Sequence, residues 1–241
     1  MSKTNKVAVF LTVYNEENLI PGVLEKIDRR YHIYVIDDGS NDRTVEISKK
    51  FGVDIISHPV NLGQGMAVIT AFRILLEKNY DFIVEMDGDG QHDPKEIPLF
   101  INKLNETEVD IVAGSRILGT NYKGAPLARK FFLTPLTYLL NKLTGYSISD
   151  FMCGFRAFRC RSLKKIKYIF DEMVEPEYIA SEMWIRFSRE RLIADEVPIT
   201  LFGRKHGFSY KGLIRYGWGV ISTIIRTKLA ILKSKKKDRR Y

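Results

Sequence analysis

Residues 82–94 read Phe-Ile-Val-Glu-Met-Asp-Gly-Asp-Gly-Gln-His-Asp-Pro. The apolar run Phe82–Met86 predicts a buried strand, and two carboxylates, Asp87 and Asp89, follow where that strand is expected to end. Because residues two apart in a strand point to the same side, both carboxylates are expected to face one cation. Gly88 and Gly90 would let a ligand approach the backbone closely. The stretch therefore predicts a site for a hard divalent ion and a diphosphate, although such triplets also occur on solvated loops.

The sequence around this stretch alternates short β-branched runs with amphipathic segments, which predicts a parallel sheet covered by helices. The expected strands are Val7–Val13, His32–Ile36, Val53–Ser57, Phe82–Met86 and Asp110–Ala113. The expected helices lie near Glu17–Arg30, Thr44–Phe51, Gly65–Lys78 and Lys95–Asn105. The last helix has Asp93 as its N-cap and Glu96 as the capping-box partner, and Pro98 is expected to shorten or distort it.

Polar residues follow four of the expected strands. In chain order they are Tyr14-Asn15-Glu16-Glu17, Asp37-Asp38-Gly39-Ser40-Asn41-Asp42, Asn61-Leu62-Gly63-Gln64-Gly65 and the stretch that begins at Asp87. In open α/β sheets, ligands bind at the carboxyl ends of the strands, so these segments are expected to meet at one edge.

Composition indicates an ordinary globular protein. The chain has 241 residues, of which 45% are hydrophobic and 28% charged, and this length suits one α/β domain. Cys153 and Cys160 give neither a disulfide framework nor a zinc signature, so reduced thiols are expected. The N-terminus lacks the apolar segment of a signal peptide, and no run approaches the roughly 20 apolar residues of a membrane span. A location on the cytoplasmic side is therefore expected.

The C-terminal region combines an apolar stripe with positive charge. Apolar residues recur at helical spacing, at Ile214, Trp218, Ile221, Ile225, Leu229 and Leu232. Between Lys233 and Arg240, six basic residues stand against one acidic residue, so this tail carries five of the nine net positive charges. Such a helix and tail suit an anionic membrane surface, and they equally suit a helix packed on the core with a solvated end. Phe131–Ile148 is likewise expected to be either core or a lipid-facing flap.

Six short motifs occur along the chain. They are Val13-Tyr14-Asn15-Glu16, Asp37-Asp38-Gly39-Ser40, Asn61-x-Gly63-x-Gly65, Asp87-x-Asp89-x-Gln91-His92, Gly114-Ser115-Arg116 and Gly154-Phe155-Arg156. Together they resemble the family 2 glycosyltransferases of GT-A fold, and within that family the dolichyl-phosphate mannose synthases and related polyprenyl-phosphate sugar transferases. The resemblance implies an α/β, Rossmann-like fold with a mainly parallel central sheet flanked by helices. The spacers Gly88 and Gly90 differ from those of mannose synthases and leave the donor sugar open.

The resemblance also implies a donor site. The residues expected to hold the nucleotide sugar are Tyr14, Glu16, Val35, Asp37, Asp87, Asp89, Gln91, Arg204 and Lys211. Among them, Asp87, Asp89 and Gln91 would bind Mg²⁺ or Mn²⁺, which would neutralise charge on the leaving nucleoside diphosphate. Asp87, Asp89 and Arg116 are the residues implied in catalysis. Asp37 and Asp38 could instead be cap or turn residues.

On the acceptor side, the resemblance implies that a phosphate is held by Arg116, Arg129, Lys130 and Asp150. A forked guanidinium matches phosphate oxygens well. Arg129 and Lys130 could instead be solvated surface charges, and Asp150 could pair with Arg156 and hold its loop. Because a polyprenyl phosphate is already an anion, it needs positioning rather than a catalytic base. His92 and His206 are accordingly expected to have structural or supporting roles.

The resulting hypothesis is a peripheral enzyme on the cytoplasmic face of a membrane. It would transfer one hexose, with inversion, from GDP-mannose or a UDP-sugar to dolichyl or polyprenyl phosphate. Residues 1–212 would form the GT-A domain, residues 213–241 would contact the membrane, and a small membrane subunit could be a partner. The alternatives are transfer to a sugar or protein hydroxyl, sugar nucleotidyl transfer, or a basic binding module with an inactive site. No nucleic-acid partner is expected, because paired aromatic RNA-binding signatures are absent.

Overall fold

The computed structural model describes residues 5–119, 127–173, 175–203 and 213–238, and for residues 127–133, 213–215 and 233–238 it describes the backbone only. Within these ranges seven strands form one sheet. They are β1 (Val7–Val13), β2 (His32–Asp37), β3 (Asp54–Ser57), β4 (Phe82–Asp87), β5 (Ile111–Ser115), β6 (Arg156–Arg159) and β7 (Ala194–Pro198). The strand order is β3-β2-β1-β4-β6-β5-β7, and every neighbouring pair is parallel except those of β6, which runs antiparallel to β4 and β5. The predicted α/β class with a mainly parallel sheet is confirmed.

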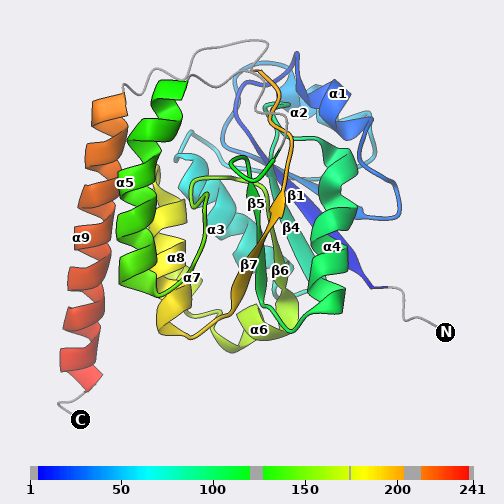
Figure 1. Cartoon of the computed structure of the whole chain (residues 1–241). Coiled ribbons are helices and arrows are strands. Elements are labelled where there is room, and N and C mark those ends of the chain that lie inside the picture. Colours follow the sequence, from blue (N-terminus) through cyan, green and yellow to red (C-terminus); the bar gives the residue numbers. More distant parts are fainter. Residues whose placement is uncertain (1–4, 120–126, 174, 204–212, 239–241) are drawn as a thin grey trace.

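Helices cover both faces of the sheet (Figure 1). They are α1 (Ile20–Leu24), α2 (Thr44–Lys49), α3 (Gln64–Leu75), α4 (Ile97–Glu106), α5 (Leu127–Thr144), α6 (Cys160–Lys165), α7 (Ile169–Glu172), α8 (Ile179–Arg189) and α9 (Leu213–Asp238). The helices α1 and α4 pack on one face, and α3, α5 and α8 pack on the other, with α9 lying outside against α5 and α8. The molecule is therefore a three-layer sandwich with an added outer helix.

The core is divided in two by the sheet. Along β1, Ala8 and Phe10 belong to the cluster under α3 and α8, whereas Val9 and Leu11 belong to the cluster under α1 and α4. All seven residues of β1 are buried, as expected for a strand that is covered on both faces. The almost continuous apolar character of Val7–Val13, interrupted only by Thr12, follows from this double burial.

The start of α4 differs from the expected capping box. Asp93 does cap the preceding 3₁₀ turn, Pro94–Glu96, since its side chain accepts a hydrogen bond from Lys95 N. The Glu96 carboxylate accepts from Thr200 N instead of bonding back to Asp93, so this half of the prediction was wrong. The distortion expected from Pro98 is confirmed, because regular α-helix begins only at Ile97 and places that proline in its first turn, where no N–H is needed.

The helix α9 packs closely on the core. Its inward side includes Val220, Thr223 and Ile224, which are all buried. A Cβ added at Gly219 would lie 2.2 Å from Cζ of the Tyr178 ring, so the glycine allows α9 to approach close to the start of α8. The apolar stripe read from the sequence is mostly on the outside. The exposed fractions are 73% for Trp218, 54% for Ile225, 53% for Leu229 and 58% for Leu232.

The neighbouring helix α5 also has two sides. Leu136 and Leu140 are buried in the core, whereas Tyr138 is 68% exposed. The segment Phe131–Ile148 therefore contributes to the core and also presents an aromatic side chain outward. No helix in the described ranges is both long enough and apolar enough to cross a bilayer.

The close contact of α9 yields a test of its packing. Gly219→Ala should lower the free energy of unfolding by about 1–3 kcal/mol, because the new methyl group overlaps the Tyr178 ring. Gly22→Ala in α1 is the matched control, since a Cβ there meets nothing within 4 Å and alanine favours a helix. Urea unfolding of the two variants measures the difference. Equal stabilities would contradict the packing described for α9.

Candidate functional site

The carboxyl edge of the sheet brings two of the predicted carboxylates next to the end of β1. In the strand register, Val13 lies beside Asp37 and Thr12 lies beside Asp87. Because successive side chains in a strand alternate, Asp37 faces the α1 side and Asp87 faces the α3 side. The point between β1 and β4 is also where the strand order reverses, which is the usual ligand-binding position in such sheets.

Asp87 ends β4 and is surrounded by polar groups. Its Oδ1 accepts hydrogen bonds from Gln64 Nε2 at 2.5 Å and from Thr12 Oγ1 at 3.4 Å, and its Oδ2 lies 3.8 Å from His92 Nε2. Burial works to raise the pKa of Asp87, but His92, Arg156 and Arg116 together lower it below the ordinary aspartate value. The Asp87 side chain is 24% exposed, so it can be reached from solvent at this edge of the sheet.

Asp89 lies in the turn after the strand. Strand β4 ends at Asp87, one residue later than expected, so the rule that residues two apart in a strand point to the same side does not extend to Asp89. The turn still keeps Asp89 close to Gln91, whose backbone N donates to Asp89 Oδ1 at 3.1 Å. Gln91 O in turn accepts from Phe202 N at 2.9 Å, so the chain just before residue 204 pairs with this turn.

The two glycine spacers have structural reasons of their own. A Cβ at Gly88 would lie 2.4 Å from the Cγ1 atom of Val13, so glycine is needed where the turn crosses β1. Gly90 has φ +73°, a left-handed conformation that favours glycine. The contact at Gly88 and the backbone conformation at Gly90 explain the two glycines without the ligand approach predicted from the sequence.

On the β2 side, two loops are joined by short side chains. Asn15, with φ 54°, donates its N–H to Ser40 Oγ at 2.9 Å, and its side chain accepts from Asn41 N at 2.8 Å. Asp37 Oδ1 accepts from Ser40 N at 3.0 Å, which makes this carboxylate also a turn residue. Between these loops the Tyr14 side chain is 42% exposed.

Of the other residues predicted on this side, Glu16 and Val35 are placed differently. Glu16 is partly buried, and its backbone N is held by Thr44 Oγ1 at 2.8 Å. Val35 is fully buried in the α1-side core, two residues before Asp37, so the structure places it in the core rather than at the edge.

Asp38 is a structural tether. Its carboxylate accepts hydrogen bonds from Leu62 N at 2.9 Å and Gly63 N at 2.8 Å, and it lies 2.8 Å from His58 Nδ1. The other ring nitrogen of His58 contacts Thr70 Oγ1 on α3 at 2.9 Å. This buried network fixes the loop that leads to Gln64 and so sets the contact between Gln64 and Asp87.

Arg116 and Asp150 form a forked ion pair. Arg116 Nε donates to Asp150 Oδ2 at 2.6 Å, and its Nη2 donates to Oδ1 at 2.8 Å. Both side chains are at least 90% buried. Burial works to raise the pKa of Asp150, but Arg116 lowers it below the ordinary range. The suggestion that Asp150 pairs with Arg156 was wrong.

Arg156 pairs with Glu85, a residue that the sequence reasoning did not single out. Arg156 Nη2 lies 2.7 Å from Glu85 Oε1, and both side chains are almost completely buried where β4 and β6 pair. Burial raises the pKa of Glu85 to about 7, although Arg156 works to lower it. A glutamate inside the apolar run Phe82–Met86 was the signal for this pair.

Gly154 brings the Asp150 loop against the β4 carboxylate. A Cβ at Gly154 would lie 2.4 Å from Asp87 Oδ2, so a larger residue would displace this carboxylate. The Gly-Phe-Arg motif therefore has two separate functions in the fold. Its glycine leaves room for the Asp87 carboxylate, and its arginine, Arg156, forms an ion pair with Glu85.

The donor set fits a hard divalent ion. Asp87, Asp89 and Gln91 supply carboxylate and amide oxygens at one strand end, and oxygen donors are those that Mg²⁺ and Mn²⁺ prefer. In the described part of the chain, no group of three or more His, Cys, Asp or Glu side chains could hold a metal by itself.

Several predicted residues lie outside the described parts. Arg204, His206 and Lys211 fall in the undescribed range 204–212, and Arg129 and Lys130 lie in the first turn of α5, where only the backbone is described. The two cysteines are described, and both are free and buried, as expected for reduced thiols.

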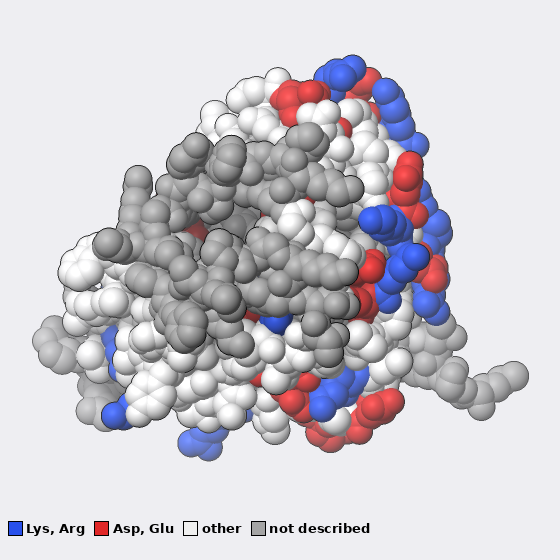
Figure 2. All heavy atoms as spheres, turned by 45° about the horizontal axis from the view of Figure 1, so that its top comes forward, with Lys and Arg blue, Asp and Glu red and all other residues white. Residues whose placement is uncertain are grey.

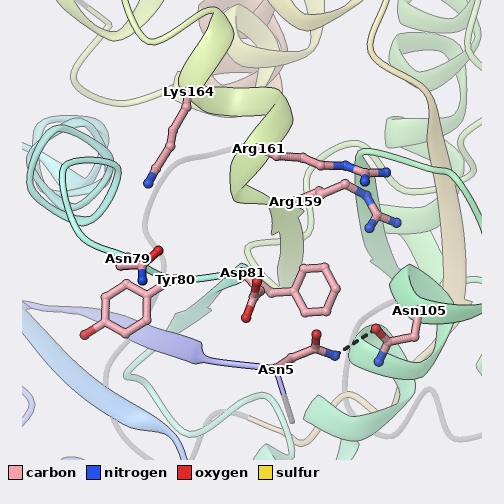
Figure 3. A pocket seen from close by; sticks show the side chains of 9 residues that line it. Asn5, Asn79, Tyr80, Asp81, Asn105, Arg159, Arg161 and Lys164 are labelled. Carbon is pink, nitrogen blue, oxygen red and sulfur yellow. Dashed lines mark hydrogen bonds between the residues drawn. The ribbon is translucent and has the colours of Figure 1, made fainter. Parts of the chain in front are cut away.

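A separate cavity of about 370 Å³ lies near the amino end of β4, away from these residues (Figure 3). Its basic side chains are already engaged within the protein. Arg159 donates to the carbonyls of Leu104, Thr107 and Val109, and Lys164 donates to the carbonyl of Lys78. The polar groups of the carboxyl edge therefore form the better candidate site.

Comparison with known proteins identifies a matching family and similar relatives. The family model described as Glycosyl transferase family 2 matches residues 8–167. An uncharacterised protein of Methanocaldococcus jannaschii is 32% identical over 237 residues, which cover 95% of this chain and 96% of that protein. The UDP-N-acetylglucosamine–dolichyl-phosphate N-acetylglucosaminyltransferase of Methanococcus voltae is 27% identical, with 92% of this chain and 96% of that enzyme covered.

A solved structure shares the fold. Glucosyl-3-phosphoglycerate synthase from Mycobacterium tuberculosis, crystallised with Mn²⁺, UDP-glucose and phosphoglyceric acid, matches with a TM-score of 0.69 at 20% identity. The match covers 92% of this chain and 79% of that chain. The fold is therefore that of the GT-A glycosyltransferases.

The buried Arg116–Asp150 pair yields a pH-dependent prediction. Asp150→Asn should lower the free energy of unfolding by about 3 kcal/mol at pH 7, because it leaves the Arg116 guanidinium buried without its counter-charge. A lowered folded-state pKa gives stability that is present above about pH 4 and lost as the pH falls through the folded value. The difference in the free energy of unfolding between wild type and Asp150→Asn should therefore be smaller at pH 3.5 than at pH 7.

Urea unfolding at pH 7 and pH 3.5 checks this result. Asp28→Asn is the matched control, since it breaks an exposed ion pair with Arg30 and should change stability little at either pH. If Asp150→Asn is as stable as wild type at pH 7, the ion pair between Arg116 and Asp150 does not stabilise the fold.

Proposed function

We propose, since the chain belongs to glycosyl transferase family 2, that it transfers a hexose from a nucleotide diphosphate sugar to the phosphate of a dolichyl or polyprenyl phosphate. One observation carries the proposal. A single loop contacts both key side chains at one edge of the sheet: its Asp150 pairs with the Arg116 guanidinium, and a Cβ at its Gly154 would lie 2.4 Å from Asp87 Oδ2. Such a pair suits a reaction in which a metal-bound diphosphate leaves while a second phosphate arrives.

The donor would lie over the ends of β1, β2 and β4. Asp87, Asp89 and Gln91 would hold Mg²⁺ or Mn²⁺ together with the diphosphate, and Tyr14, Glu16 and Asp37 line the adjacent loops. Arg204 and Lys211 are proposed to meet the same diphosphate. When bound there, the ion would supply a Lewis acid that stabilises the charge developing on the nucleoside diphosphate.

The acceptor phosphate would lie beside Arg116. Asp150 accepts hydrogen bonds from Nε and Nη2 of Arg116 and so fixes the plane of the guanidinium, and we propose that the phosphate is met by this oriented group. Arg129 and Lys130, in the first turn of α5, are proposed as further phosphate ligands. Three cationic groups on one phosphate would offset the repulsion between the two anionic substrates.

The chemistry then needs no proton transfer from the acceptor. A phosphate oxygen forms a bond to C1 of the sugar, while the bond between C1 and the diphosphate oxygen breaks, and this direct displacement inverts the anomeric configuration. Because the attacking oxygen is already ionised, the protein has to hold and orient it. No general base is proposed, and His92, 3.8 Å from Asp87, is proposed to support that carboxylate.

The surface of α9 supports a lipid-bearing acceptor rather than a soluble one. We propose that Trp218, Ile225, Leu229 and Leu232, which are all more than half exposed, face the membrane together with Tyr138 of α5. In the view of Figure 2, few acidic side chains are visible on the left side, where α5 and α9 lie in Figure 1, and most of them lie on the right or at the bottom. The basic residues after Leu232 would add attraction to anionic lipid.

A transfer assay tests the proposed reaction. Purified protein with Mg²⁺ or Mn²⁺ and short polyprenyl phosphate should convert a radiolabelled GDP- or UDP-sugar from a panel into an organic-soluble product. Asp89→Asn should lower that rate by at least about 10²-fold, because it removes a charged metal ligand. Asp93→Asn is the matched control, since this acid four residues further along caps a 3₁₀ turn. No lipid product from any donor would refute the proposed reaction.

Vesicle binding tests the proposed membrane face. Replacing Trp218 and Leu229 by serine should weaken binding to anionic vesicles by tenfold or more, because burying each side chain in lipid contributes about 1.5–3 kcal/mol. The control replaces two exposed apolar residues elsewhere, Val60 and Leu99, by serine. Co-sedimentation with phosphatidylglycerol vesicles measures both variants. Equal binding of the two double variants would place the membrane contact on another surface.

A further inference from the structure

We propose that Glu196 on β7 is a positioning residue for the acceptor phosphate. It fixes the turn Ser149–Asp150, and this turn fixes the direction of the Arg116 guanidinium. The inference rests on the proposed function, because it assigns Arg116 to the acceptor. It adds a residue that contacts no reacting group and acts through the backbone of a turn.

The first step is the attachment of the turn to the end of β5. Ser149 Oγ lies 2.6 Å from Ser115 Oγ, and Asp150 Oδ2 accepts a hydrogen bond from Arg116 N at 3.2 Å as well as from Arg116 Nε. Two consecutive residues of the turn are thus bonded to two consecutive residues of the strand end. A shift of the turn would carry the Arg116 side chain with it.

The second step is the attachment of the turn to Glu196. The Glu196 carboxylate accepts hydrogen bonds from Ser149 N at 2.7 Å, from Ser149 Oγ at 3.0 Å and from Asp150 N at 3.1 Å. Neither N–H is satisfied by regular secondary structure, since residues 145–150 lie between α5 and β6. Among the described contacts, Glu196 is the side chain that bonds both backbone N–H groups of the turn.

The strand register explains why Glu196 can reach the turn. In the parallel pair of β5 and β7, Glu196 lies beside Ala113, two residues before the end of β5. The side chain is only partly exposed, and burial raises its pKa although the hydrogen bonds from the turn work to lower it. A partly buried carboxylate with three donors on it is a fixed anchor rather than a solvated surface charge.

Other side chains hold the flanks of the turn and leave its centre to Glu196. The Asn141 side-chain amide pairs with both the N–H and the C=O of Ile148, each at 2.9 Å, and Trp184 Nε1 donates to Phe151 O at 3.1 Å. With both flanks held, loss of Glu196 should loosen the turn locally without releasing the whole loop. The consequence should appear at Arg116 and at the acceptor phosphate, not at the donor site.

Steady-state kinetics of Glu196→Ala and Glu196→Gln test this role. The KM for short polyprenyl phosphate should rise about tenfold in the alanine variant, while the KM for the nucleotide sugar changes less than about twofold. Glutamine should give a smaller rise, because its amide oxygen still accepts from one side of the turn. The matched control is Asp195→Asn, which removes the same charge from the next residue, whose carboxylate pairs with Lys103 at 2.7 Å.

The outcomes separate this inference from the proposed function. Thermal unfolding first verifies that the variants fold. An unchanged acceptor KM in folded Glu196→Ala, or an equal rise in both KM values, overturns the positioning role. If the wild type transfers no sugar, the proposed function fails. Equilibrium binding of short polyprenyl phosphate then tests the positioning role of Glu196 by itself. Tighter binding by wild type than by Glu196→Ala supports the inference, whereas equal binding or no binding overturns it.

Discussion

The insertion of β6, antiparallel, between β4 and β5 is the constraint on which the site depends. Because β4 and β5 end at the carboxyl edge, the strand between them has to begin there. The loop that enters β6 therefore crosses the edge between Asp87 and Arg116. Its Gly154 lies against the carboxylate of Asp87, and its Asp150 forms a bidentate ion pair with Arg116. The proposed donor-side and acceptor-side groups are joined by one short loop, so their closeness follows from the topology.

Buried charge at this edge favours function over stability. Removing Glu85 and Arg156 from water is costly, and their pair leaves Glu85 Oε2 and Arg156 Nε and Nη1 without partners in the described part of the chain. An apolar pair of similar size would serve the sheet at least as well. The positive charge of Arg156 has an effect on a neighbouring carboxylate. Together with Arg116, it lowers the pKa of Asp87. An ionised Asp87 beside the proposed phosphate site would be able to bind a cation at neutral pH.

Sequence patterns predicted the parts of the molecule whose signal is local. The β-branched runs located β1 to β5, and the polar residues after them located the edge, because strand burial and strand ends both leave traces in adjacent residues. The short strands β6 and β7 contain charged residues and no β-branched run, so the sequence pattern did not predict them. Pairing of Arg116 with Asp150, 34 residues away, depends on the loop into β6 and was not predictable from spacing. Periodicity found an apolar face on α9 but not its direction, because the small residues Gly219 and Thr223 allow close packing and leave the large side chains outside.

The central claim is that a divalent ion at Asp87 and Asp89 and a phosphate at Arg116 occupy one site together. Phosphorus-31 relaxation of short polyprenyl phosphate, measured with Mn²⁺ and either GDP or UDP bound, tests this claim directly. The account predicts strong paramagnetic relaxation of the lipid phosphorus in the wild type and its loss in Arg116→Gln. Relaxation equal to that of free polyprenyl phosphate under conditions where the lipid is bound would contradict it.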